Sequence, residues 1–135
     1  MPAFIAKKLV QLLLKNDKSP KQARVLVLGI TFKENVADIR NSKVANLVRE
    51  LQDYSVQVDV ADPLADPLEV MDAYGIALIE RASPPYDAVT VAVAHDGYKG
   101  YDTAYFASIM TQKPVLIDLK GIYPNIGPEI DYWKL

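Results

Sequence analysis

The segment VLVLGITFKENVADIRNS, residues 25–42, decides the fold of this chain. Residues 25–28 are an unbroken run of valine and leucine, which is typical of a strand buried on both faces of a parallel sheet. The run ends at Gly29, and Ser42 is a suitable N-cap for the amphipathic helix that follows. We therefore expect a strand, a loop and a helix. Open parallel sheets bind their ligands at the carboxyl ends of the strands, which is where this loop starts.

The loop carries two cations, Lys33 and Arg40. An ammonium, a planar guanidinium and a helix N-terminus at one strand end favour an anionic ligand, with phosphate as the leading candidate. Lys120 ends the last predicted strand and is expected to point into the same crevice. The alternatives are a solvated surface lysine at position 33 and an ion pair between Arg40 and Asp38 or Glu34. Asp38 itself is expected to orient the loop as a turn residue.

Apolar segments of two periodicities alternate along the rest of the chain. Helices are predicted over 3–15, after Ser42, over 67–74 and near 102–111, and strands over 23–29, 56–61, 76–79, 88–94 and 115–119. Strands that alternate with helices indicate an α/β fold with a parallel sheet. We expect a three-layer α/β/α Rossmann-like domain with a mainly parallel sheet of five or six strands.

The composition narrows the range of functions. The 135 residues suit one domain, with a formal net charge of −2, no cysteine and one histidine, His95. Disulfides, thiolate metal sites and thiol nucleophiles are therefore excluded, and we expect no metal site. Neither nucleic-acid nor membrane binding is expected, and the absence of a signal-peptide pattern favours a cytoplasmic protein. A binding domain, or part of a larger enzyme, fits best.

Three other strand ends carry residues with two possible roles each. Gly29 stands alone, so the three-glycine fingerprint of dinucleotide binding is not present. Asp62 followed by Pro63 reads more readily as a strand terminus and helix start than as a ribose-binding acid. His95 also follows a strand and is expected to be a hydrogen-bonding residue rather than a base.

The pattern G-x-x-F-K-x-N-x-x-D-x-R-x-S of residues 29–42 resembles the C-terminal domain of UDP-glucose/GDP-mannose dehydrogenases. The resemblance extends to VDVADP at 58–63 and to DLK at 118–120, and so covers most of the chain. It is greatest for the branch that oxidises UDP-N-acetylhexosamines for bacterial surface polysaccharides.

The resemblance implies a function and a set of site residues. Enzymes of this family oxidise the C6 alcohol of a nucleotide sugar to a carboxylate with NAD and a cysteine. Phe32, Lys33 and Lys120 are then expected to contact the UDP-sugar substrate, and Arg40 to reach NAD across a domain cleft. Because the family cysteine is absent, this chain is expected to hold no catalytic residue. The parent enzyme would supply an N-terminal NAD-binding domain and form a homodimer.

The same resemblance implies a division of the chain. Residues 1–22 would form a helix and loop that continue from a missing central segment, and residues 23–135 the UDP-sugar-binding domain. Alone, the chain should bind but not catalyse. The alternative is a stand-alone regulatory module that binds nucleotide or phosphate without a reaction. A receiver-like switch fits less well, because such switches place acids at strand ends where this chain has lysines.

Overall fold

A five-stranded parallel sheet in the order β2-β1-β3-β4-β5 forms the centre of the molecule. The computed structural model describes all residues from 1 to 135. The strands are β1 (Arg24–Leu28), β2 (Gln57–Ala61), β3 (Tyr86–Val91), β4 (Met110–Asp118) and β5 (Asp131–Lys134). The predicted α/β class is confirmed, and the sheet is parallel throughout.

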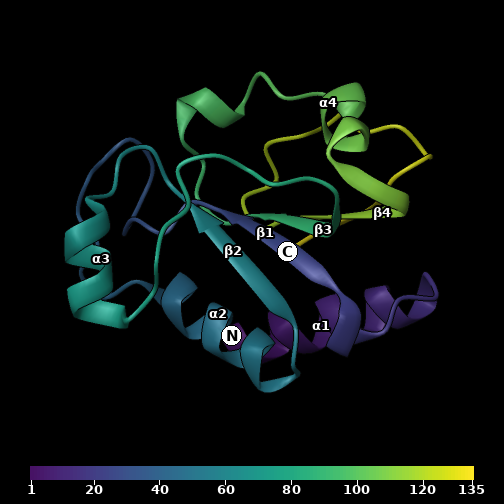
Figure 1. The fold of residues 1–135 in the computed structure, drawn as a ribbon. Helices are drawn as coiled ribbons and strands as arrows, with labels where there is room; N and C mark the ends of the chain where they lie inside the picture. Colours follow the sequence, from purple (N-terminus) through teal and green to yellow (C-terminus); the bar gives the residue numbers. More distant parts are fainter.

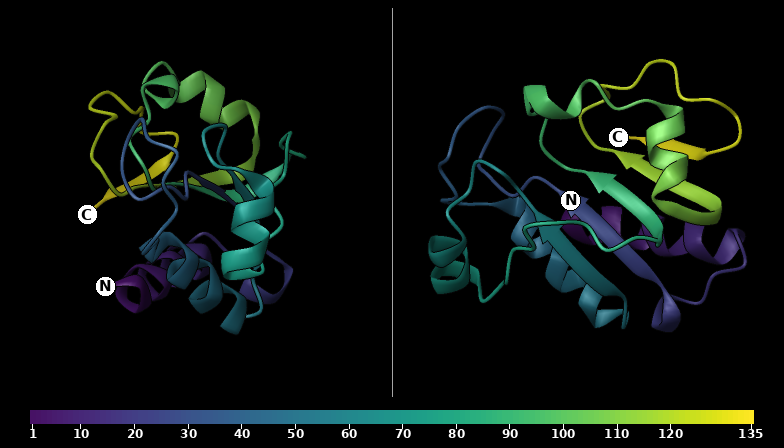
Figure 2. Two further views of the ribbon diagram at one scale, coloured as in Figure 1. Left: turned by 90° about the vertical axis from the view of Figure 1, so that its left-hand side faces the viewer. Right: turned by 45° about the horizontal axis from the view of Figure 1, so that its top comes forward.

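Helices lie on both faces of this sheet. They are α1 (Pro2–Lys15), α2 (Lys43–Asp53), α3 (Pro67–Tyr74) and α4 (Thr103–Ser108), with short 3₁₀ turns at Pro20–Gln22 and Asp96–Tyr98. Helices α1 and α2 lie side by side beneath the sheet, α4 covers the opposite face, and α3 lies beyond the outer edge at β2 (Figures 1 and 2). The molecule therefore has the three layers that the sequence predicts.

Side chains of strand β1 belong to both hydrophobic cores. Val25 and Val27 point into the core between the sheet and helices α1 and α2, whereas Leu26 and Leu28 point into the core between the sheet and α4. A strand buried on both faces has no polar side, because each face must be apolar. This explains the unbroken apolar run with which the sequence opens its strand.

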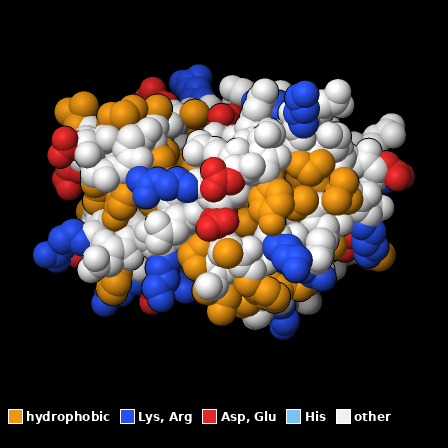
Figure 3. Space-filling view, turned by 90° about the horizontal axis from the view of Figure 1, so that it is seen from below, with side chains coloured by type: hydrophobic (Ala, Val, Ile, Leu, Met, Phe, Trp, Pro, Cys, Tyr) orange, Lys and Arg blue, Asp and Glu red, His pale blue; other side chains and the backbone are white.

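The first helix folds back onto the sheet. Leu9, Leu12 and Leu13 are buried against α2 and the sheet, so this apolar stripe is covered within the chain. Phe4 remains 54% exposed, with its ring centroid 6.3 Å from that of Trp133 in β5. On the face formed by α1 and α2, acidic and basic side chains are interspersed among apolar ones (Figure 3). No helix is long and apolar enough to cross a membrane.

The strand predicted at 76–79 is not formed. Only one bridge joins Leu78 to Val60 in β2, with a hydrogen bond from the Ile79 N–H to the Val60 carbonyl. The physical reason lies in the topology. The chain must leave the β2 edge at once to reach β3, which pairs with the far side of β1.

The C-terminal elements also differ from the prediction. Helix α4 ends at Ser108 and β4 begins at Met110, within the range predicted as helix and before the predicted strand at 115. β5 was not predicted. It pairs with β4 at the sheet edge and is only half-buried. An edge strand of this kind needs no apolar run, and Tyr132 and Trp133 lie between the charged residues Asp131 and Lys134. The sheet thus has five strands, with β5 in place of the segment 76–79.

Candidate functional site

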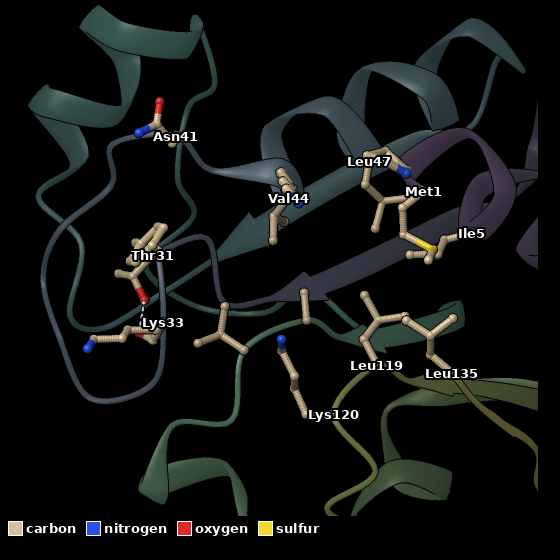
Figure 4. A pocket seen from close by; sticks show the side chains of 15 residues that line it. Met1, Ile5, Thr31, Lys33, Asn41, Val44, Leu47, Leu119, Lys120 and Leu135 are labelled. Atoms are coloured by element: carbon tan, nitrogen blue, oxygen red, sulfur yellow. Dashed lines mark hydrogen bonds between the residues drawn. The ribbon is translucent and has the colours of Figure 1, made fainter.

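A cavity of about 320 Å³ opens at the carboxyl ends of β1, β3 and β4. In Figure 4 the side chains of Met1, Ile5, Leu47, Leu119 and Leu135 gather at one end, Thr31, Lys33 and Asn41 lie at the other, and Lys120 lies between them. The apolar residues of the lining are Met1, Pro2, Ile5, Phe32, Val44, Leu47, Ala92, Val93, Leu119 and Leu135, and the polar ones are Thr31, Lys33, Asn41, Lys43 and Lys120. This place matches the position expected for a ligand of an open parallel sheet.

The structure brings the three predicted substrate residues, Phe32, Lys33 and Lys120, to this one cavity. Lys120 directs its ammonium into the space between the strand ends, whereas the ammonium of Lys33 extends away from it in Figure 4. Phe32 is 56% exposed at the rim. None of the lining lysines forms an ion pair with a carboxylate. Their charge is therefore available to an anion.

The N-terminus of α2 adds to this positive side. Ser42 caps the helix as predicted, with its hydroxyl accepting from the Ala45 N–H at 3.4 Å. Lys43 and Val44, in the first turn, line the cavity. The first N–H groups of a helix lack intrahelical acceptors and carry the positive end of its dipole. Sequence reasoning missed Lys43, although its position directly after the cap was a usable signal.

Close packing and a buried carboxylate hold the loop that carries Lys33. Gly29 has φ +97°, and a Cβ atom there would lie 2.6 Å from the Cβ of Val93. The side chain of Asp62 accepts hydrogen bonds from the backbone N–H groups of Ile30 at 2.8 Å and Thr31 at 3.2 Å. It also accepts from the Leu64 N–H at 2.9 Å, directly after β2 ends, whereas the helix start predicted there lies further on, where Asp66 caps α3.

Arg40 lies outside the cavity lining, with 85% of its side chain exposed. Its guanidinium donates to both carboxylate oxygens of Asp38, the nearest at 2.8 Å, and its backbone N–H donates to Asp38 at 2.9 Å. The ion pair and the turn role of Asp38 are thus both present. The hydrogen bonds from Arg40 lower the pKa of Asp38 to about 2.

A second buried carboxylate supports the turn that presents Lys120. Asp118 accepts a hydrogen bond from the Tyr123 N–H at 3.0 Å and from the Tyr132 hydroxyl at 2.6 Å. Gly121 takes the left-handed conformation, φ +66°, directly after Lys120. The end of β4 is therefore held from both sides, which fixes the backbone from which Lys120 extends.

A second, larger cavity of about 760 Å³ lies on the α4 side of the sheet. Its charged residues are carboxylates, Asp62 and Glu80, and no lysine or arginine lines it. Tyr101 and Tyr105 stack there with centroids 4.0 Å apart, and burial raises the pKa of Tyr105 to about 12. An anion would find no counter-charge in this cavity, so the lysine-lined cavity is the candidate phosphate site.

Comparison with known proteins identifies the family. The sequence model for the UDP-glucose/GDP-mannose dehydrogenase family, UDP binding domain, matches residues 26–125. The chain belongs to this family. Two relatives are named UDP-N-acetyl-D-glucosamine 6-dehydrogenase. The one from Pseudomonas aeruginosa is 40% identical over 121 residues, or 89% of this chain, and the one from Salmonella typhi 38% identical over 125 residues, or 92%.

The dehydrogenase relatives are much longer than this chain, which spans 29% of the length of each of these two. A solved structure titled as UDP-D-ManNAc dehydrogenase from Pyrococcus horikoshii has a TM-score of 0.82 at 25% identity. The similarity covers 99% of this chain and 30% of that one. The family and fold expected from the sequence motifs are thus confirmed.

Proposed function

We propose that this chain is the UDP-sugar-binding part of an NAD-dependent nucleotide-sugar 6-dehydrogenase. The observation that carries the proposal is the group of three lysines without ion pairs, Lys33, Lys43 and Lys120, at one cavity beside the start of α2. A diphosphate placed there would meet Lys120, whose ammonium points into the space, and the start of α2 with Lys43, while the exposed Lys33 can reach it by rotating its side chain. Family membership supports UDP as the nucleotide.

The two-sided lining suits the rest of such a ligand. The diphosphate would lie at the lysines, while the apolar side formed by Ile5, Leu47 and Leu119 would shelter less polar ligand atoms from water. Phe32, exposed at the rim, is placed to contact the ring of a base or sugar. The relatives named for UDP-N-acetyl-D-glucosamine support an N-acetylhexosamine as the sugar.

Oxidation would take place in the parent enzyme rather than in this chain alone. The chain has no cysteine, and Gly29 stands where a dinucleotide fingerprint would need three glycines. The residues of this chain could therefore contribute one contact to NAD, but they do not form an NAD-binding site. The N-terminal domain of the parent would hold NAD, which would supply a hydride acceptor for each of the two two-electron oxidations from the C6 alcohol to the carboxylate.

Arg40 is the residue proposed for that contact. Its side chain is exposed, and its partner Asp38 belongs to the same loop, so the guanidinium can turn to a phosphate of NAD without unfolding the domain. Exposed ion pairs of this kind contribute little to stability, typically about 0–1 kcal/mol. We further propose a homodimeric cytoplasmic parent that supplies uronic acid precursors for bacterial surface polysaccharides, with residues 1–22 leading from its central segment.

Nucleotide selection by the isolated chain tests this function. In calorimetry, UDP-N-acetylglucosamine and UDP should bind more tightly than ADP, and incubation with NAD and the nucleotide sugar should give no NADH. A regulatory module specific for another nucleotide would reverse the order of affinities. NADH production by this chain alone would contradict the assignment as a non-catalytic part.

A further inference from the structure

His95 is the only histidine of the chain and is 2% exposed, just beyond the end of β3. It does not line the cavity that holds the lysines. Both ring nitrogens nevertheless have partners. Nδ1 lies 2.9 Å from the backbone nitrogen of Asn35, and Nε2 lies 3.0 and 3.1 Å from the two carboxylate oxygens of Asp62.

These contacts assign one protonation state to the ring. The backbone N–H of Asn35 can only donate, so Nδ1 must accept and carries no proton. Nε2 therefore carries the proton and donates it to Asp62, which is an acceptor for backbone N–H groups as well. The imidazole is neutral, and its contact with Asp62 is a hydrogen bond rather than an ion pair.

The same contacts fix the loop on both sides of Lys33. On one side, the N–H of Thr31 donates to Asp62, and its hydroxyl donates to the Lys33 carbonyl at 2.9 Å. On the other side, Asn35 donates to His95 and accepts, through its side-chain oxygen, a hydrogen bond from the Asp96 N–H at 2.9 Å. Asn35 has φ +61°, so the loop turns sharply where it is held.

We propose that His95 is a positioning residue that bridges Asp62 to the backbone of Asn35 and so holds Lys33 at the nucleotide cavity. We call Asp62, His95 and Asn35 the clasp. Buried and bonded through both nitrogens, His95 does not touch the ligand or transfer a proton to it. The effect on nucleotide binding rests on the proposed function, whereas the effect on the loop does not.

Two substitutions separate the two arms of the clasp. In His95→Asn the side-chain oxygen takes the place of Nδ1 and can accept from Asn35, but Nε2, which donates to Asp62 and also lies 3.3 Å from the Thr31 hydroxyl, is lost. In His95→Gln the amide nitrogen takes the place of Nε2 and can donate to Asp62, but the acceptor for Asn35 is lost. Each variant is measured in the 135-residue chain by melting temperature, UDP calorimetry and amide ¹⁵N relaxation of residues 32–35.

Binding and stability should change in opposite order. His95→Gln, which keeps the buried donor to Asp62, should melt closer to wild type. Its loosened loop must be ordered when UDP binds, so affinity should fall by up to about tenfold, the limit set by one lost hydrogen bond. His95→Asn should melt lower but bind UDP within about threefold of wild type. The wild-type ¹⁵N spectrum of the single histidine should show the neutral tautomer protonated at Nε2.

A purely structural role would make UDP affinity follow the melting temperature, with His95→Gln binding as well as wild type, and this would overturn the proposal. A tautomer protonated at Nδ1 would overturn it too. If wild type itself failed to bind UDP, the proposed function would fall. The clasp would then stand only if residues 32–35 loosened in His95→Gln and not in His95→Asn.

Discussion

Lys33, Lys43 and Lys120 come from three separate segments and reach one cavity without a carboxylate partner. Other lysines such as Lys21 also lack an ion pair, so it is the position of these three at the carboxyl ends of the strands and the start of α2 that supports an anionic ligand. Of the two predicted lysines, Lys120 points into the space in Figure 4 and Lys33 points away from it, and the backbone of Lys120 is held by the turn at Asp118. Lys120 is thus the cation whose loss should matter most for the isolated chain.

The ion pair between Arg40 and Asp38 can be tested through the pKa of Asp38. The hydrogen bonds from Arg40 hold the pKa of Asp38 at about 2, below its ordinary value of 3.8. In Arg40→Ala the carboxylate loses the guanidinium donors but keeps the backbone N–H of residue 40, so its pKa should rise part of the way toward 3.8, as measured by ¹³C NMR titration. The sign follows because removing a cation disfavours the charged form. A pKa of Asp38 that stays near 2 in Arg40→Ala would show that the pair does not exist in solution.

The full-length enzyme would separate the roles proposed for Lys33 and Arg40. Lys33→Ala should mainly raise the KM for the UDP-sugar, because it removes a cation proposed to contact the substrate. Arg40→Ala should mainly raise the KM for NAD by roughly ten- to a hundredfold, the loss of one charge-assisted contact of about 1.5–3 kcal/mol. Arg40→Lys should restore only part of the affinity, since an ammonium lacks the bidentate fork.

The melting temperature of each variant must also be measured, because Arg40 pairs with Asp38 and its loss could destabilise the loop. Lys33→Ala and Arg40→Ala should both keep the melting temperature of the parent enzyme. If Arg40→Ala instead melted early and left the KM for NAD unchanged, Arg40 would be a loop-stabilising residue and its proposed contact with NAD would be wrong.

Among the elements, the β1–α2 connection depends on one glycine. Gly29→Ala would place a Cβ atom 2.6 Å from that of Val93 in a left-handed backbone conformation, so the loop or the segment after β3 must shift. We expect a loss of about 1–3 kcal/mol in unfolding free energy and weaker UDP binding. Chemical denaturation and calorimetry measure the two effects.

Gly97→Ala is the matched control, because Gly97 has no atom within 4 Å of an added Cβ and no left-handed φ. It should leave both stability and UDP affinity close to wild type. Equal behaviour of the two alanine variants would show that the close approach at Gly29 does not matter.

The sequence predicts those elements whose signals are local. Residues 25–28 read as a buried strand because both faces are apolar, and Lys33 and Lys120 could be placed together because carboxyl ends of parallel strands share one edge. β5 gave no such signal, since Tyr132 and Trp133 are edge residues flanked by charge. Lys43 was missed, although its position directly after the Ser42 cap was the signal available in the sequence.

The long-range hydrogen bonds of the site could not be predicted from the sequence. The bond between Asp62 and His95 spans 33 positions, and the one between Asn35 and His95 spans 60. No periodicity or spacing encodes such contacts, because the topology of the sheet creates them. The sequence could predict a hydrogen-bonded role for His95 but not its partners.

At the scale of the whole molecule, α1 determines how the isolated chain behaves. Leu9, Leu12 and Leu13 are buried, which leaves Met1, Phe4 and Leu14 as the large exposed apolar residues at this helix. A stripe this short favours a monomer or a weak dimer. Sedimentation should show a monomer at micromolar concentration, whereas a dimer that persists at nanomolar concentration would reveal an interface elsewhere on the surface.

The central claim is that the lysine-lined cavity binds the diphosphate of UDP, and calorimetry with lysine variants tests it most directly. Lys21→Ala is the control, because Lys21 lies before β1, at the opposite end of the strand, and forms no ion pair. UDP should bind wild type and Lys21→Ala equally, and Lys120→Ala about tenfold more weakly. Uridine should bind weakly to all three. Equal affinity for UDP and uridine, or a Lys120→Ala variant that binds UDP like wild type, would contradict the account.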